Sequence, residues 1–434
     1  MQHNLSIIIL AAGKGTRMKS SIPKVLHKMS GKEMLYYSIE EAKKLSNDIH
    51  VVLYHQADLV QSSMQKYFEN VHYHIQDHDN YPGTGGAVMG IKPKNEKVLV
   101  LNGDMPLIEA EELKQLTQTS NKLTMSVLNL TSADGYGRVL VQNDKVFKIV
   151  EQKDCNKDEL SITTANAGIY CFDTTFLLDN LPKLSNKNAQ EEYYITDLVE
   201  IAVNNNIEVK PVIVKEENFK GVNSKYDLAN AEVIHQNRIK TGFLKAGITM
   251  RLPDTIYIEH GVQIEGESTI ENGVTLLGNS KIINSHIKTN SIVEDSSLEN
   301  SDIGPMARIR PFSILKGTHI GNFVEVKKST LIAVKAGHLA YLGDSFIDEG
   351  TNVGAGTITC NYDGVNKHKT IIGKNVFIGS DTQLVAPIKI EDDVMIAAGS
   401  TITNDVKSGD LALSRTKQKT IAGFFYKFFN KNKK

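Results

Sequence analysis

Short apolar segments alternate with amphipathic ones along the first half of the chain, up to about residue 225. The segments "SIIIL", "HVVLY", "KVLVLNGD" and "LTMSVLNL" predict short buried strands. Between them lie stretches such as "EMLYYSIEEAKKL", which predict helices. Strands alternating with helices form βαβ units, so we expect an α/β domain over residues 1–225 with a mostly parallel, Rossmann-like sheet. Such a sheet places its ligand site at the carboxyl ends of its strands.

The segment "KYDLANAEVIHQNRIKTGFLKAG" follows, and we expect it to form one connecting helix over residues 226–246. Beyond it, over residues 247–434, aliphatic residues recur every six positions. The sets at this spacing are Ile258, Ile264, Ile270, Leu276 and Ile282; Ile292 and Leu298; Ile303, Ile309 and Leu315; and Ile372, Ile378, Leu384, Ile390, Ile396 and Ile402. A period of six fits neither a helix face nor independent hairpins. It is typical of a parallel β-helix, whose coils stack these residues in an interior ladder.

The six-residue repeat is interrupted between Ile358 and Ile372 by the polar segment "TCNYDGVNKHKT". We expect this segment to project from the β-helix as a loop. Long loops that leave a rigid scaffold are commonly functional, although a tolerated surface insertion is the alternative interpretation.

Composition excludes several classes of protein. Lys and Arg together number 49 and Asp and Glu 50, so the charge balance does not suggest a nucleic-acid-binding protein. The three cysteines form no C-x-x-C pair, which argues against structural zinc or a disulfide framework and suits a reducing cytoplasm. The first predicted strand begins too early for a signal peptide, and no apolar run approaches the length of a membrane span. We therefore expect a cytoplasmic protein.

The glycine-rich string "LAAGKGTRMKSSIPK", residues 10–24, directly follows the first predicted strand. Met18 stands where a dinucleotide fingerprint would have its third glycine, and no P-loop string occurs. At Gly13 and Gly15 the backbone N–H groups can approach phosphate oxygens, and Arg17 and Lys24 add charge that suits a triphosphate. The alternative is a solvated turn with incidental basic residues. The string predicts a nucleotide site.

Longer strings make the chain resemble one family. "LAAGKGTRM" with "PKVLH" is similar to the sugar-nucleotide pyrophosphorylase signature. "YLGD", "NVGAGTITCNYDG" and "VFIGSDTQLVAP" resemble the acetyltransferase half of the bifunctional N-acetylglucosamine-1-phosphate uridyltransferase/glucosamine-1-phosphate acetyltransferases. The resemblance covers nearly the whole chain and implies a left-handed β-helix. It also implies acetyl transfer from acetyl-CoA to glucosamine-1-phosphate, then uridyl transfer from UTP to N-acetylglucosamine-1-phosphate with release of pyrophosphate. The product, UDP-N-acetylglucosamine, is a precursor of bacterial cell-wall and lipopolysaccharide sugars.

The resemblance also assigns expected roles in the first half. The residues expected to bind UTP or UDP-N-acetylglucosamine are Leu10, Ala11, Ala12, Gly13, Arg17, Lys24, Gln76, Gly83, Thr84, Asn102, Gly137, Glu151, Asn166 and Asn223. The segment from Gln76 to Gly83 is two residues longer than the family pattern, and Gly86 replaces a histidine. Asn102 stands where the family motif more often has tyrosine.

Asp104 and Asn223 are expected to hold Mg²⁺, whose hard-oxygen ligands and charge suit the attack of one phosphate on another. The alternative for Asp104 is the N-cap of a helix formed by "PLIEAEEL".

In the second half the resemblance makes His338 the expected general base, because acetylation removes a proton from the attacking amine. Glu325 is expected to orient it. Glucosamine-1-phosphate is expected to contact Arg310, Lys327, Tyr341 and Asn352, and acetyl-CoA to contact Ala355, Asn361, Tyr362, Ser380, Ala398 and Arg415. His72, His74 and His78 are interpreted as surface residues.

The resemblance further implies a homotrimer with acetyltransferase sites between neighbouring β-helices. The end of the chain, "IAGFFYKFFNKNKK", could touch an anionic membrane, but we expect a partly packed, frayed tail. Two other functions stay open from the sequence: a pyrophosphorylase whose β-helix only trimerises the chain, and a pyrophosphorylase for another sugar or nucleotide with a regulatory β-helix.

Overall fold

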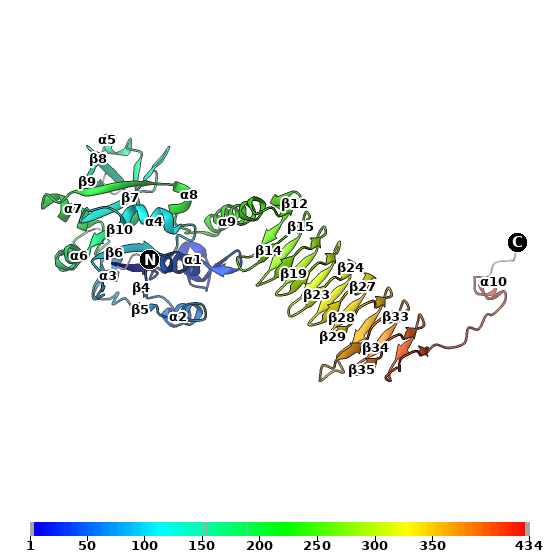
Figure 1. The fold of residues 1–434 in the computed structure, drawn as a ribbon. Coiled ribbons are helices and arrows are strands. Elements are labelled where there is room, and N and C mark those ends of the chain that lie inside the picture. Colours follow the sequence, from blue (N-terminus) through cyan, green and yellow to red (C-terminus); the bar gives the residue numbers. More distant parts are fainter. Residues whose placement is uncertain (1–3, 151, 153–154, 189, 430–434) are drawn as a thin grey trace. The chain divides into compact units, whose positions relative to one another are not determined.

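The computed structural model describes residues 4–150, 152, 155–188 and 190–429. The chain divides into two compact units, Met1–Asn237 and Arg238–Lys434. In Figure 1 the first unit runs from blue to green and the second from green to red. The helix α9 (Lys225–Lys245) spans the division. Its Leu228 and Ala231 pack in the first unit, whereas Ile239 and Phe243 pack against the core of the second.

The first unit is built on a nine-stranded sheet of order β5-β4-β1-β6-β10-β7-β11-β9-β8. Strands β5 (His72–Ile75), β4 (Asp48–Leu53), β1 (Leu5–Leu10) and β6 (Lys97–Asn102) are parallel neighbours. The other strands are β10 (Thr164–Asp173), β7 (Leu123–Asn129), β11 (Val209–Val214), β9 (Lys145–Val150) and β8 (Arg138–Gln142). Only β10 and β9 run against the common direction of this sheet. The predicted α/β fold is confirmed.

Helices cover both faces of this sheet. The central strand β1 carries aliphatic side chains on both faces, and both sets have to be shielded from water. Ile7 and Ile9 belong to one core cluster and Ile8 to another. Side chains of α1 (Met34–Lys43), α2 (Ala57–Gln65) and α4 (Ala110–Thr117) fill the first cluster. Those of α3 (Gly83–Val88), α6 (Thr174–Asn180) and α7 (Asp197–Asn204) fill the second. The carboxyl ends of β1 and β6 are thus held between two packed layers.

The second unit is a left-handed parallel β-helix, as expected from the repeat. Its three faces are sheets of ten, nine and eight strands, each coil adding one short strand to each sheet. The ten-stranded face runs from β12 (Thr249–Met250) to β38 (Leu411–Ala412). The nine-stranded face begins at β13 (Tyr257–Ile258), and the eight-stranded face at β14 (Gln263–Glu265).

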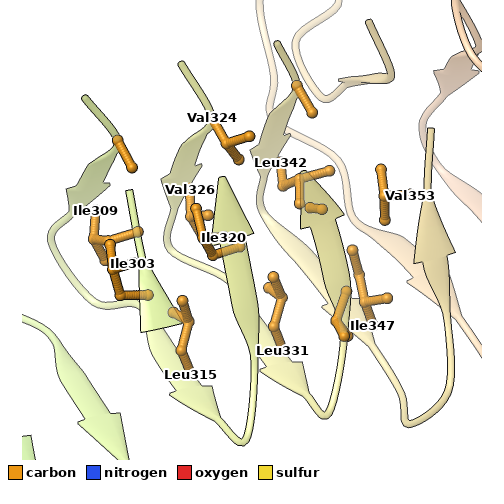
Figure 2. Packing of buried hydrophobic residues seen from close by; sticks show 14 of the residues in the cluster. Ile303, Ile309, Leu315, Ile320, Val324, Val326, Leu331, Leu342, Ile347 and Val353 are labelled. Carbon is orange, nitrogen blue, oxygen red and sulfur yellow. The ribbon is translucent and has the colours of Figure 1, made fainter. Parts of the chain in front are cut away.

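The interior of the β-helix is a continuous column of aliphatic side chains. Figure 2 shows side chains of successive coils pointing inward, among them Ile303, Ile309 and Leu315. The predicted ladder is confirmed at most positions, but Ile292 was assigned wrongly: it is half-buried, and Val293 is the interior residue. Ile287 already follows Ile282 by five residues, so tight corners shift the six-residue register.

The interruption of the repeat also lies one residue away from its expected place. Ile358 faces outward, and Thr359 occupies the interior position of β31 (Ile358–Cys360). The hydroxyl of Thr359 accepts a hydrogen bond from Gly343 N (2.8 Å) and donates to Gly343 O (3.0 Å), which satisfies it inside the column.

The end of the chain departs from the expected packed tail. Residues 413–429, including α10 (Phe424–Phe428), are exposed throughout. The expectation of partial packing is therefore wrong for the single chain. Among the described residues, no helix combines the length and apolarity needed to cross a membrane.

The ladder predicts a clear asymmetry between neighbouring residues of β23 (Ile314–Lys316). Leu315 is fully buried and Ile314 is 42% exposed. We expect Leu315→Ala to lower the free energy of unfolding of the β-helix by about 2–5 kcal/mol, because it leaves a cavity in the column. The matched variant Ile314→Ala should change it by about 0.5 kcal/mol or less. Urea denaturation of both variants measures this, and equal losses would contradict the assigned register.

Candidate active sites

A cleft of about 250 Å³ opens at the carboxyl ends of β1 and β6. It brings together many of the residues predicted to bind nucleotide or metal: Leu10, Ala11, Ala12, Gly13, Lys24, Gln76, Gly83, Thr84, Asn102 and Asp104. These residues come from three separate segments of the chain, 10–24, 76–84 and 102–104, which lie at the carboxyl ends of the parallel strands β1, β5 and β6. The cleft is where the strand order predicts a site.

The glycine-rich turn leaves space on one side and is tightly packed on the other. A side chain at Gly13 would meet nothing within 4 Å, so its backbone is open to the cleft. Gly15 has φ +61°, and an added Cβ would lie 2.5 Å from the Cβ of Lys24. Gly15 therefore lets Lys24 lie directly against the turn.

Cationic and oxygen-bearing side chains converge beside this turn. The Lys24 ammonium donates hydrogen bonds to Asp104 Oδ2 and to Asn223 Oδ1, the latter at 3.2 Å. Arg17 donates to the same Asn223 oxygen at 2.9 Å. Asp104 is not a helix N-cap, because α4 begins after Glu109. The alternative role considered for Asp104 is therefore wrong.

The donor set around Lys24 suits a hard divalent cation. Asp104 and Asn223 present a carboxylate and an amide oxygen, and both now face the positive charge of Lys24. Two protein oxygens are few, but a cation that binds substrate phosphates typically needs few protein ligands. The described residues contain no cluster of three or more His, Cys, Asp or Glu that could hold a metal by itself.

The long segment after Gln76 is folded back against α3. Gln76 is buried, and its amide donates to Tyr81 O (2.9 Å) and Gly83 O (3.0 Å). This places the carbonyl of Tyr81 against Gly86, where an added Cβ would come within 2.1 Å of that oxygen. The close approach of this carbonyl requires glycine at position 86.

The irregular part of β10 is bonded to Asn102, which lines the cleft. Asn102 donates to Gly168 O (3.1 Å), and Gly168 N donates to Asn166 Oδ1 (2.9 Å). Asn166 N in turn donates to Gly137 O (3.0 Å). Gly137 and Asn166 do not line the cleft, and they connect to it through Asn102. Arg17 and Asn223 do not line it either, and Asn223 is joined to it by its bond to Lys24. Glu151 lies outside the described residues.

The sequence did not predict four residues that also line the cleft: Val25, His78, Ala87 and Glu192. The interpretation of His78 as a surface residue is wrong, because it is half-buried in the cleft. His74 is also half-buried, and it bonds His50 at 2.8 Å. Burial lowers the pKa of both His50 and His74. His78 lies between the expected nucleotide contacts Gln76 and Gly83, and this position is the signal that could have found it.

In the β-helix, the expected phosphate-binding residues lie on the nine-stranded face. Arg310 of β22 (Arg308–Arg310) pairs in register with Lys327 of β25 (Glu325–Lys327), and Tyr341 starts β28 (Tyr341–Gly343) on the next coil. Arg310 and Lys327 line a cavity of about 320 Å³ together with Asp344 and Lys367. Asn352, in β30 (Asn352–Val353), lies on the ten-stranded face instead.

This cavity is crowded with positive charge. Lys327 lies 3.7 Å from Asp344 Oδ2, which also accepts from Asn361 at 2.5 Å. The neighbouring Lys327 ammonium lowers the pKa of Lys367, a residue that the sequence did not single out. Such a surplus of cations suits a phosphomonoester. The amide of Asn361, expected at acetyl-CoA, is turned inward toward Asp344.

His338 and three expected acetyl-CoA residues share one corner of the β-helix. His338 ends β27 (Lys335–His338), and Ala355, Ser380 and Ala398 follow strands of the same face on later coils. Backbone bonds tie these corners, from Gly356 N to Leu339 O (3.1 Å) and from Asp381 N to Ala355 O (2.7 Å). His338 is exposed. Glu325 accepts from Arg310 at 2.8 Å and does not contact His338, so its expected orienting role is not seen in the single chain.

The other two coenzyme-binding candidates lie at the edges of this region. Arg415 donates to Ala398 O at 3.0 Å, so it extends the corner row. Tyr362 is exposed at the base of the loop that follows β31, where it forms a bridge with Lys367. Asp363 closes the loop by accepting from Val365 N, Asn366 N and His368, and these bonds hold the pKa of its carboxyl well below the usual range. The loop is therefore internally braced.

A nucleotide cleft on a three-layer α/β unit, followed by a cationic site on a hexapeptide β-helix, defines a two-part transferase. Residues 7–167 match the family described as MobA-like NTP transferase domain. Residues 369–404 match the family described as bacterial transferase hexapeptide (six repeats).

Full-length relatives carry the same combination. The chain is 71% identical over 429 residues to the bifunctional protein GlmU of Aliarcobacter butzleri, covering 99% of each chain. It is 60% identical to that of Wolinella succinogenes and 57% to that of Nitratiruptor sp., covering 99% of this chain and 100% of each relative. The chain belongs to the family of bifunctional GlmU proteins. The expectation of a bifunctional enzyme of uridyl and acetyl transfer is thereby confirmed, and the family is consistent with a divalent metal.

Proposed function

We propose that the cleft of the first unit joins UTP to N-acetylglucosamine-1-phosphate, and that the β-helix first acetylates glucosamine-1-phosphate with acetyl-CoA. The observation that carries the first assignment is the convergence of Lys24, Arg17, Asp104 and Asn223 beside an open glycine turn at the ends of β1 and β6. Family membership over the whole chain supports both assignments.

Uridyl transfer brings one phosphate against another, so the protein has to neutralise charge and fix geometry. Backbone N–H groups near Gly13, with Lys24 and Arg17, would bind the triphosphate. Gln76, Gly83 and Thr84 would bind uracil, while Gly137, Glu151 and Asn166 would bind the sugar. Mg²⁺ held by Asp104 and Asn223 would supply further positive charge at the reacting phosphates. Asn102 would keep β10 in place through Gly168.

Replacing Asp104 tests this assignment. We expect Asp104→Asn to lower kcat for Mg²⁺-dependent uridyl transfer by about 100-fold or more, because it removes the carboxylate expected to bind the cation. Acetyl transfer should stay within about twofold, since its residues lie in the other unit. The control Asp58→Asn, at an exposed position of α2, should leave both rates unchanged. Both activities are measured by mass spectrometry of products, and parallel loss of both in a folded variant contradicts the proposal.

Acetyl transfer requires a base, an anion site and a coenzyme site. Arg310, Lys327 and Tyr341, with Asn352, would bind the phosphate of glucosamine-1-phosphate. His338 would take the proton as the amine attacks the thioester carbonyl, and coenzyme A thiolate would leave. Ala355, Asn361, Tyr362, Ser380, Ala398 and Arg415 would bind acetyl-CoA. The common corner of His338, Ala355, Ser380 and Ala398 supports this arrangement.

Removing the base should isolate its effect. We expect His338→Ala to lower kcat for acetyl transfer by about 10²–10⁴, the usual contribution of a general base. The control His286→Ala, on the same face several coils earlier, should keep kcat. Near-normal turnover of His338→Ala, measured by thiol release, removes this residue from the mechanism.

We infer a homotrimer with acetyltransferase sites shared between chains. Phe377, Met395 and Leu411 stack in register as an exposed apolar column on the face that carries Asn352. A neighbouring β-helix would cover it. The free thiols of Cys171 and Cys360 support a cytoplasmic location.

Mixing variants tests the shared site. His338→Ala and Arg415→Ala should each be weak alone, and trimers reassembled from both should recover acetyl transfer because some sites combine two intact halves. Light scattering should give about three times the 48.0 kDa of one chain. Absence of recovery in confirmed mixed trimers shows that His338 and Arg415 of each site come from the same chain, and it contradicts a site divided between these two residues.

A further inference from the structure

His78 lies in the nucleotide cleft without a role assigned above. Its side chain lines the cleft together with Gln76, Gly83 and Thr84. It comes from the segment after Gln76, which folds the carbonyl of Tyr81 against Gly86.

The His78 ring is held by stacking. Its centroid lies 4.5 Å from that of Tyr54, with the two planes 13° apart. Tyr54 directly follows β4, and the ammonium of Lys14 lies 6.0 Å from its ring centroid. Three loops, after β1, β4 and β5, therefore meet through Lys14, Tyr54 and His78. Such ring and cation contacts fix the plane of the imidazole.

The loop that carries His78 is closed by hydrogen bonds of its own. Asp77 accepts from Asn80 N (3.3 Å) and from the Asn80 amide (2.8 Å), and Asp77 O accepts from Tyr81 N (2.8 Å). Gln76 then fixes Tyr81 O at 2.9 Å. Hydrogen bonds thus hold the turn on both sides of His78. The neighbouring Asp79 is exposed to solvent.

The two ring nitrogens of His78 are available for hydrogen bonds to a ligand. Among the side-chain bonds formed by the described residues, none uses its ring nitrogens. The amide of Gln76, by contrast, already donates to two carbonyls, so its N–H groups are not free for a ligand. A neutral imidazole supplies one donor and one acceptor.

We propose that His78 is a specificity-determining residue for the nucleotide, and that its imidazole hydrogen-bonds the nucleoside end of UTP while stacked on Tyr54. The nucleoside end is chosen because His78 shares its loop with the expected base contacts Gln76, Gly83 and Thr84, whereas the cations lie on the glycine-rich turn. This inference rests on the proposed function, in which UTP occupies the cleft.

The test compares His78→Ala, His78→Phe and Asp79→Ala in the full-length protein. We expect His78→Ala to raise the KM for UTP about tenfold and to keep kcat within about twofold. A tenfold change is what the loss of one hydrogen bond to a ligand typically causes. The preference for UTP over CTP, as a ratio of kcat/KM, should fall as well. His78→Phe keeps a ring on Tyr54 but lacks the bond, so it should show a similar KM, while Asp79→Ala should match the original protein.

Further measurements separate the possible outcomes. The KM for N-acetylglucosamine-1-phosphate and the acetyl-transfer rate should not change, and calorimetric titration with UTP should show the same loss of affinity. An unchanged KM and preference in His78→Ala overturn the proposal. So does an equal defect in Asp79→Ala, or a lowered kcat and Tm with unchanged UTP affinity, since these mark a structural loop. If the unmodified protein transfers no uridyl group, the proposed function itself has failed.

Discussion

Parallel strand pairing is the constraint on which both candidate sites depend. When neighbouring strands run in the same direction, the residues that follow them emerge side by side. In the first unit this places Leu10, the last residue of β1, beside Asn102, the last residue of β6, in direct register. In the β-helix it places the corner of His338 beside those of Ala355, Ser380 and Ala398 on later coils. Residues distant in sequence become neighbours without any special loop.

The two units meet this constraint with different cores. The central strand β1 is buried on both faces, so its run of three isoleucines needs helices on each side. The β-helix encloses one face of every strand and leaves the other outside. Its strands can therefore present Arg310, Lys327 and Tyr341 outward while Ile309, Val326 and Leu342 hold the interior. Residues that stabilise the core and residues expected to bind substrate thus alternate along the same strands.

The sequence predicted the elements of the fold better than the contacts of the sites. Periodicity is a property of consecutive residues, so the strands of the first unit and the β-helix were predictable. The predicted interior position was wrong at Ile292, because a five-residue step between interior positions earlier in the chain leaves no mark in composition. At Thr359 the interior position is taken by a hydroxyl, which can replace an aliphatic group when its hydrogen bonds are satisfied. The pairing of Lys24 with Asp104 and Asn223 joins residues far apart in the chain. The resemblance assigned Lys24 to phosphate and the other two residues to the metal, and it did not predict that they bond one another.

Gly86 and His78 are linked through one segment of the chain. The segment after Gln76 places the carbonyl of Tyr81 where any side chain at position 86 would collide with it. Glycine at position 86 is therefore required by the path of this segment. The same segment carries His78 to the stack on Tyr54. A side chain at position 86 would displace Tyr81 and with it the turn that holds His78, so the two positions are coupled through the backbone between them.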